Sequence, residues 1–199
     1  YEIDVQDPDD SGTSRESGYT FDFGQVALNT KSPGKAFQIH NLGIGGILDI
    51  ESIEIINDPE NNFSYSGPHN TSIPAADSTP FTVYYNPATV SANHTAQLVI
   101  RSNDDDEDPY EINLQGGSLQ PGVTVKCGPD IYPDNSTVLF DPQNINVTSE
   151  GRTFTITNEG SWPLTISNIF IDDDEYFDYS GPHSASLDPG GSTSFTLSY

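Results

Sequence analysis

Runs of carboxylates are the residues of this 199-residue chain whose type and spacing could do chemistry. One run spans residues 104–108, a second spans 172–175, and a smaller group is Asp7, Asp9 and Asp10. Ca²⁺ takes about six to eight hard oxygen ligands, so closely spaced carboxylates on loops can converge on one ion. The sequence therefore offers five candidate calcium ligands: Asp104, Asp106, Asp108, Asp172 and Asp174.

A second interpretation of these runs stays open. Their spacing does not fit an EF-hand, because no glycine and distal glutamate follow at the required positions. Adjacent residues on a strand also point to opposite faces, so only part of each run could reach one ion. The alternative to a calcium site is a solvated loop of mutually repelling charges.

A histidine recurs in the two copies of a Tyr-Ser-Gly-Pro-His segment, at His69 and His183. No cysteine, second histidine or paired carboxylate recurs around it, so we interpret the segment as a turn rather than a metal or catalytic site. The chain also has no G-x-S-x-G, H-E-x-x-H, P-loop or G-x-G-x-x-G motif before a helix. We therefore expect no enzyme, no catalytic residues and no cofactor other than calcium.

Five N-x-S/T sequons flank predicted turns and could carry glycans in a host that glycosylates secreted proteins. They are Asn62, Asn70, Asn93, Asn135 and Asn146. With 30 acidic and 6 basic residues, the formal net charge is -24. Such a charge repels nucleic acid and anionic membrane surfaces, so we exclude both as partners. The scarcity of lysine favours an extracellular or cell-surface location.

The elements that must position these residues are predicted to be short β-strands. Phe37 and Ile39 alternate with polar neighbours, and Phe81, Val83 and Tyr85 share one face of their run. Turn clusters such as NTKSPG, NLGIGG and DPGGS separate the runs. No apolar run approaches the ~20 residues that cross a bilayer, so no membrane insertion is expected. This pattern predicts an antiparallel β-sandwich.

The chain also repeats itself. Residues 63–85 return at 177–199 with 12 of 23 positions identical, which indicates two copies of one module. Upstream, FDFGQV (21–26) matches LFDPQN (139–144). The Asn-x-Gly turn at 41–43 matches the one at 158–160. We place the first domain at 1–117 and the second at 118–199, joined by the short linker GGSLQPG.

These motifs resemble a known family, the Ig-like ASH superfamily (abnormal-spindle and Hydin-like modules), and within it the choice-of-anchor D repeats of bacteria and archaea. Its D-F-G segment, N-x-G turn, S-N-D and closing L-x-G are matched here by Phe23 and Gly24, Asn41 and Gly43, Ser102, Asn103 and Asp104, and Leu114 and Gly116. The second domain departs at Asp141 and Pro142. The resemblance implies seven-stranded Ig-like sandwiches in tandem on large secreted or surface-anchored proteins.

The second copy stops at the tyrosine equivalent to Tyr85, so we expect it to lack its last strands. A longer native polypeptide, or a strand donated by a neighbouring subunit, would complete it. A domain left open would expose its edges and invite aggregation, which disfavours that third explanation. Strand exchange through Tyr1–Val5 or Phe195–Tyr199 is the form of self-association that we expect.

We therefore predict an all-β chain of two tandem Ig-like antiparallel β-sandwich domains, the second lacking its last strands. The predicted function is a non-catalytic structural module of an extracellular filament, stalk or adhesin. Its expected partners are copies of itself or further repeats of the same polypeptide. The alternative is an accessory module that binds glycan or calcium within a larger secreted protein.

Overall fold

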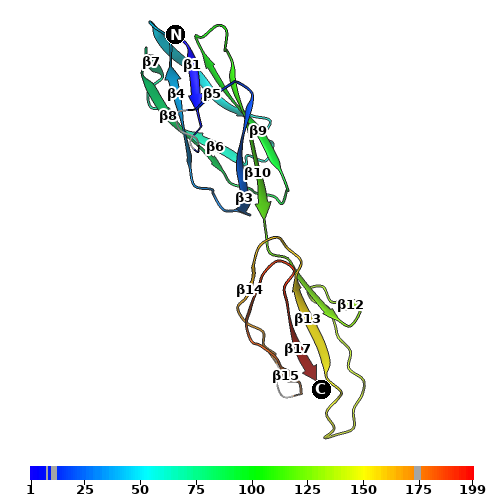
Figure 1. Cartoon of the computed structure of the whole chain (residues 1–199). Coiled ribbons are helices and arrows are strands. Elements are labelled where there is room, and N and C mark those ends of the chain that lie inside the picture. Colours follow the sequence, from blue (N-terminus) through cyan, green and yellow to red (C-terminus); the bar gives the residue numbers. More distant parts are fainter. Residues whose placement is uncertain (8, 10–12, 173–175) are drawn as a thin grey trace. The chain divides into compact units, whose positions relative to one another are not determined.

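Alternating apolar residues form β-strands throughout the computed structural model, which describes residues 1–7, 9, 13–172 and 176–199. This part of the chain contains no helix, and hence none that could cross a membrane. The predicted all-β class is confirmed. The chain divides into two compact units, Tyr1–Leu119 and Gln120–Tyr199 (Figure 1). We describe each unit by itself.

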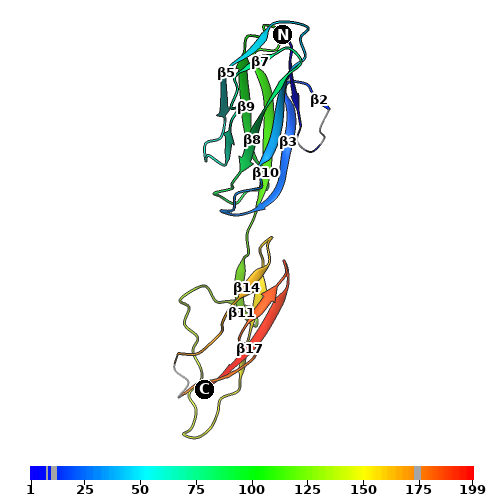
Figure 2. The same cartoon turned by 90° about the vertical axis from the view of Figure 1, so that its left-hand side faces the viewer.

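The first unit is an Ig-like sandwich of two five-stranded sheets (Figure 2). One sheet has the order β2-β1-β4-β8-β6, formed by Ser14–Arg15, Ile3–Gln6, Lys35–Asn41, Ser78–Tyr85 and Phe63–Ser66. The other has the order β3-β10-β9-β5-β7, formed by Tyr19–Ala27, Tyr110–Leu119, His94–Ser102, Ile47–Ile56 and Ser72–Pro74. β10 pairs with β3 in parallel, and its pairing with β9 is antiparallel.

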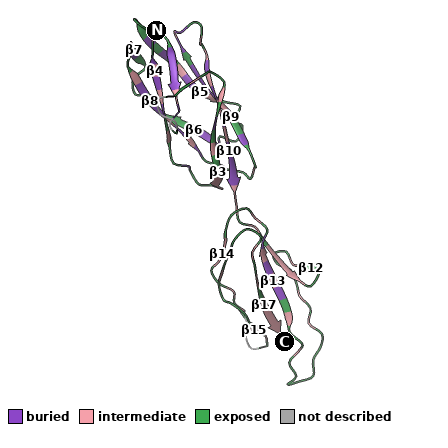
Figure 3. Cartoon of the chain, in the orientation of Figure 1, coloured by how far each residue is buried: buried purple, intermediate pink, exposed green. Residues whose placement is uncertain are grey.

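The core of the first unit consists of buried aromatic and branched aliphatic residues from both sheets. Figure 3 shows the buried stretches of these strands in purple. Phe37 and Phe81 lie opposite each other on β4 and β8, and their rings stack at 5.2 Å. Tyr85 is fully buried and stacks on Phe63 at 4.9 Å. The apolar side chains that alternate along the sequence, and from which the strands were predicted, are therefore the core residues.

The second unit repeats one of these sheets and has little of the other. Its larger sheet has the order β12-β11-β13-β17-β15, formed by Asp130–Ile131, Val123–Cys127, Arg152–Asn158, Ser192–Ser198 and Asp178–Ser180. Phe154 lies opposite Phe195, the same register as Phe37 opposite Phe81 in the first unit. The smaller sheet is the pair β14 (Leu164–Ile166) and β16 (Ala185–Leu187). Among the described residues of this unit, no strand corresponds to β3, β9 or β10.

One segment of the repeat is shifted by a residue from the expected alignment. Phe140 lies 5.7 Å from Phe177 and 6.4 Å from Tyr199, ring to ring. In the first unit Phe23 occupies this place, at 5.9 Å from both Phe63 and Tyr85. Phe140 therefore corresponds to Phe23, and the match of FDFGQV with LFDPQN is wrong by one position. The error matters because a slip of one residue exchanges the two faces of a strand.

The asparagine of the first N-x-G turn is a buried junction. Asn41 is 0% exposed, and its Oδ1 accepts hydrogen bonds from the backbone N–H groups of Glu2 at 3.2 Å and Gly43 at 3.1 Å. Its Nδ2 donates to the carbonyls of Ile73 at 2.9 Å and Gly46 at 3.3 Å. One amide thus ties together the incoming chain, the turn and β7, which is why a buried polar side chain is tolerated here.

The second unit has the same junction. Asn158 is also 0% exposed, and its Oδ1 accepts from the N–H groups of Gly122 at 3.1 Å and Gly160 at 3.0 Å. Its Nδ2 donates to the carbonyls of Leu187 at 2.9 Å and Trp162 at 2.8 Å. We call this pair of residues the asparagine clamp. It gives the N-x-G motif a structural role at the start of each unit.

The glycine of each N-x-G turn is required by a close approach of backbone. A Cβ on Gly43 would lie 2.4 Å from the Cα of Tyr1, and a Cβ on Gly160 would lie 2.2 Å from the N of Gly122. Contacts this short do not occur at real Cβ atoms, so a side chain at either place must displace the incoming chain. The glycine therefore lets the clamp close on the first residues of each unit.

Candidate functional site

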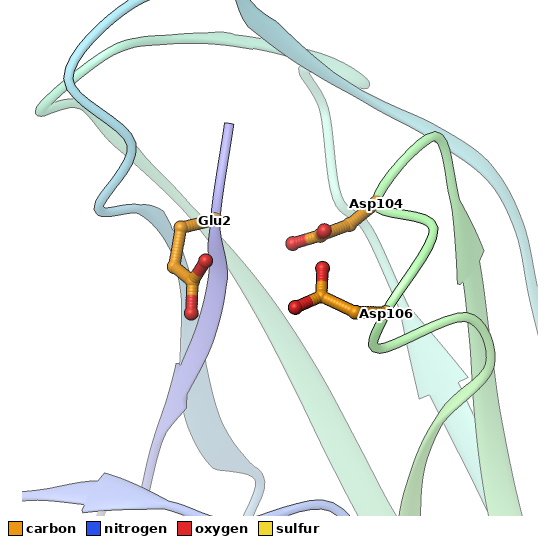
Figure 4. A group of neighbouring side chains, drawn as sticks. All are labelled: Glu2, Asp104 and Asp106. Atoms are coloured by element: carbon orange, nitrogen blue, oxygen red, sulfur yellow. The ribbon is translucent and has the colours of Figure 1, made fainter.

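Three carboxylates from distant parts of the sequence meet at one end of the first unit (Figure 4). Glu2 precedes β1, while Asp104 and Asp106 lie in the loop between β9 and β10. One oxygen from each can be chosen so that all three lie within 4.8 Å of one another. No other group of three metal-ligating side chains gathers this closely among the described residues. We call these three residues the acidic cluster.

The local fold explains why this loop reaches β1. Asp104 is 2% exposed, and its Oδ2 accepts a hydrogen bond from the backbone N–H of Ile3 at 2.7 Å. β1 belongs to one sheet and the β9–β10 loop connects strands of the other, so this bond links the two layers of the sandwich. Hydrogen bonds to an ionised acceptor are stronger than neutral ones, which favours an aspartate at position 104.

Burial and repulsion between carboxylates disfavour negative charge at the acidic cluster. Burial raises the pKa of Asp104, and Asp106 raises it further, while the N–H of Ile3 opposes the rise. Burial also raises the pKa of Glu107, with added repulsion from Glu2 and the nearby aspartates. The Oε2 atom of Glu107 is buried and has no hydrogen-bond partner among the described residues. A hard cation held by the carboxylates of the acidic cluster would relieve this repulsion.

The other predicted acidic residues do not join the acidic cluster. Asp108 instead accepts a hydrogen bond from the N–H of Ser102 at 3.1 Å, which ties the loop to the end of β9. Asp172 is exposed in the second unit, and Asp174 lies outside the described residues. Of the third group, Asp7 pairs with Arg15 at 3.6 Å and Asp9 with Lys35 at 2.6 Å, while Asp10 is not described. The structure thus brings together two of the five predicted ligands and adds Glu2.

The repeated histidines lie in exposed turns. His69 follows β6, and His183 follows β15, with its Nδ1 3.0 Å from the carbonyl of Ile169 and its ring 5.0 Å from that of Tyr179. The interpretation of the shared segment as a turn fits this placement. Neither histidine is part of the acidic cluster.

Sequence reasoning missed a buried polar network around His94. This side chain is 8% exposed, and its Nδ1 lies 2.7 Å from the hydroxyl of Tyr85, which also donates to the carbonyl of Gly116 at 3.0 Å. On the other side of the ring, Nε2 lies 3.1 Å from Thr89 Oγ1 and 3.4 Å from Glu60 Oε2. Burial raises the pKa of Tyr85 to about 12, so its hydroxyl keeps the proton it donates. The spacing of these residues carries no motif.

One predicted glycosylation site needs correction. Asn62 is 3% exposed, its Oδ1 accepts from the N–H of Ala88 at 3.0 Å, and its Nδ2 donates to Glu60 at 3.2 Å. A glycan cannot fit on a buried amide that is bonded on both sides, so Asn62 is no acceptor in the folded unit. The remaining four sequon asparagines are exposed: Asn70, Asn93, Asn135 and Asn146.

Comparison with known proteins adds no family. No family model matches the chain, and no curated protein matches it. Among solved structures, the secreted serine protease VesC from Vibrio cholerae is similar at 13% identity and a TM-score of 0.40, over 89% of this chain and 44% of the protease. A Porphyromonas gingivalis protein of unknown function is similar at 12% identity and a TM-score of 0.33, over 98% of this chain and 82% of that protein.

The CupB2 chaperone of Pseudomonas aeruginosa is similar at 9% identity and a TM-score of 0.32, over 81% of this chain and 80% of the chaperone. Similarities this remote do not carry an activity or a partner over to this chain. The chain spans less than half the length of the protease that it matches. Function must therefore be argued from the residues themselves.

Proposed function

We propose that this chain is a non-catalytic structural module, built from Ig-like ASH-type repeats, of an extracellular filament, stalk or adhesin. The observation that carries the proposal is the kind of residue that the two copies keep. The identical residues of 63–85 and 177–199 include Phe81 and Phe195, which stack on Phe37 of β4 and Phe154 of β13. They also include Phe63 and Phe177, which pack against Tyr85 and Tyr199. The aromatic residues that both copies keep therefore serve the packing of the core.

The asparagine clamp supports the same proposal. The side chains of Asn41 and Asn158 bond only backbone groups, and both residues are 0% exposed, so neither is accessible to a ligand. The net charge of -24 keeps such a module soluble and prevents non-specific association, as an exposed surface protein requires. Partners of this module are further copies of the repeat.

Particle size and shape test the proposal. We expect electron microscopy and light scattering of the longest native polypeptide that contains this chain to show filaments or extended particles. A compact, monodisperse monomer whose polypeptide contains no further copy of the repeat would contradict the structural role. Turnover of a peptide, ester or glycoside substrate would contradict its non-catalytic part.

Calcium binding at the acidic cluster is a second candidate function. It is favoured by the convergence of Glu2, Asp104 and Asp106. It is also favoured by the buried Oε2 of Glu107, for which the described part of the chain offers no hydrogen-bond partner. Calcium would link the chain before β1 to the β9–β10 loop and so stabilise the first unit. The test is thermal unfolding in EDTA and then in Ca²⁺.

Matched variants make this calcium test specific. We expect Ca²⁺ to raise the midpoint of the unaltered chain and of Asp105→Asn, which is an exposed neighbour outside the acidic cluster. The rise should be lost in Asp106→Asn. An unchanged midpoint in the unaltered chain removes this candidate.

A further inference from the structure

The second sheet of the second unit is much smaller than its counterpart in the first unit. In the first unit this sheet has five strands, in the order β3-β10-β9-β5-β7. In the described part of the second unit, only β14 and β16 occupy this layer. The opposite sheet is nearly the same in both units, so the comparison isolates what differs.

Core residues of the second unit are exposed where their counterparts in the first are buried (Figure 3). Tyr85 is 0% exposed, whereas its counterpart Tyr199 is 44% exposed. Beside the stacked pair Phe154 and Phe195 lies an open hollow of about 650 Å³ lined largely by apolar side chains. A second hollow of about 680 Å³ is lined partly by Tyr199 and Val147. Uncovered apolar surface of this kind marks an interaction site.

The strands that are shortened in the second unit are those that β9 and β10 pair with in the first. β5 runs for ten residues, and its later part pairs with β9 through Ile53 opposite Ile100 and Ile55 opposite Leu98. Its counterpart β14 has three residues, and residues 167–172 form no strand. β3 pairs with β10, and its counterpart near residue 140 is likewise not a strand. The segments lose strand structure where the partner strands are not present.

The two strands expected to exchange do not suit this surface. β1 already pairs with β2 and β4, and its Ile3 and Val5 are 3% and 0% exposed, so donating it would open the first unit. β17 pairs with β13 on one side and β15 on the other. Both are internal strands of their own sheets, and the uncovered layer needs two strands rather than one.

We propose that the uncovered face of the second unit binds a β-hairpin with the pattern of β9 and β10, supplied by polypeptide that continues from β17. The first unit shows what covers this face, and the proposal rests on the structural role argued above. The first hairpin strand would run antiparallel to 164–171, with aliphatic side chains opposite Ile169 and Ile171. The second would run parallel to the segment around Phe140.

Covalent continuation is the source favoured by the first unit. There, eight residues separate β8 from β9. A short connection gives the hairpin an effective concentration of about millimolar at its site, whereas a free hairpin must also lose translational and rotational freedom. The two inward faces of the hairpin would then bury Tyr199, as β9 and β10 bury Tyr85.

The test extends the full chain with its own sequence. Residues 86–119 are appended after Tyr199, and hydrogen exchange is measured for 164–172 and for β17. We expect amide exchange in 167–171 to slow by about tenfold or more, since these amides would join a ladder. The matched control carries Leu98→Asp and Ile100→Asp in the appended copy only, and it should give no protection. Exchange in the first unit verifies that its own strands have not been displaced.

The outcomes separate the parts of the proposal. If the extension protects 167–171 no better than its control, the docking surface is refuted. If the same 34 residues added as a free peptide at equal concentration protect as well as the extension does, covalent continuation is the wrong source. Neither result bears on whether the longer polypeptide forms filaments, so failure here is distinct from failure of the structural role.

Discussion

Replacing Asn41 by alanine removes four hydrogen bonds at the point where the incoming chain, a turn and β7 meet. Two of these bonds, from Glu2 N–H and to the Gly46 carbonyl, are long at 3.2 and 3.3 Å and contribute little. The bond to the Ile73 carbonyl is short at 2.9 Å and is buried. A buried group left without its partner costs about 1–3 kcal/mol, so we expect Asn41→Ala to lower the free energy of unfolding of the first unit by about 2–4 kcal/mol.

The assay must report on the first unit alone. Hydrogen exchange measured across a urea series gives the stability of each unit from its own peptides. Trp162 is the single tryptophan of the chain, so its fluorescence follows the second unit and should not change in Asn41→Ala. Asn158→Ala should give the converse result. Exposed Asn93→Ala is the control, and we expect it to stay within about 0.5 kcal/mol of the unaltered chain.

A specific outcome would refute this reasoning. If Asn41→Ala destabilises the first unit no more than Asn93→Ala does, the clamp is not a structural junction. Asn41→Asp adds a second check, because it keeps an oxygen for Gly43 N–H and loses the donor to the Ile73 carbonyl. We expect it to be destabilised as well.

Three further predictions concern other parts of the first unit. Gly43→Ala should destabilise it by about 1–3 kcal/mol in urea unfolding, because the new Cβ meets Tyr1, whereas Gly45→Ala meets nothing within 4 Å and should be neutral. Hydrogen bonds from the Thr89 hydroxyl, and then from the Asn62 amide, hold the pKa of Glu60 below its usual 4.5. The stabilising effect of ionised Glu60 is therefore present above pH 4.5 and is lost as the pH falls through the lowered pKa of the folded protein. In acid unfolding, Glu60→Gln should make the loss of stability below pH 4.5 less steep. Peptide mapping after secretion from a glycosylating host should find no glycan on Asn62, and a glycan there on folded protein would contradict its burial.

The sequence predicted the strands well because their apolar residues alternate. Phe37, Ile39, Phe81 and Val83 all point into the core as expected. The N-x-G turn was also visible, but its buried asparagine was not, since nothing local shows that Asn41 reaches Ile73 across 32 positions.

The candidate site was predicted only in part. The run 104–108 marked the loop, yet Glu2 lies about a hundred positions away and has no pattern linking it to Asp104. The acidic side chains of the run also have different partners, because Asp108 accepts a hydrogen bond from the Ser102 N–H. The alignment of FDFGQV with LFDPQN set Asp22 opposite Phe140, whereas the ring packing of Phe140 and Phe23 decides the register.

The parallel pairing of β3 and β10 has a mechanical consequence. Their register runs from Tyr19 beside Ile112 to Ala27 beside Leu119, so tension that pulls β3 from its beginning and β10 from its end shears the whole ladder at once. Bonds loaded together resist force far better than bonds opened one after another. The described residues of the second unit have no such ladder. When the ladder between β3 and β10 carries the load, we expect the first unit to resist a higher force than the second. A docked hairpin whose second strand runs parallel to the segment around Phe140 would give the second unit an equivalent ladder.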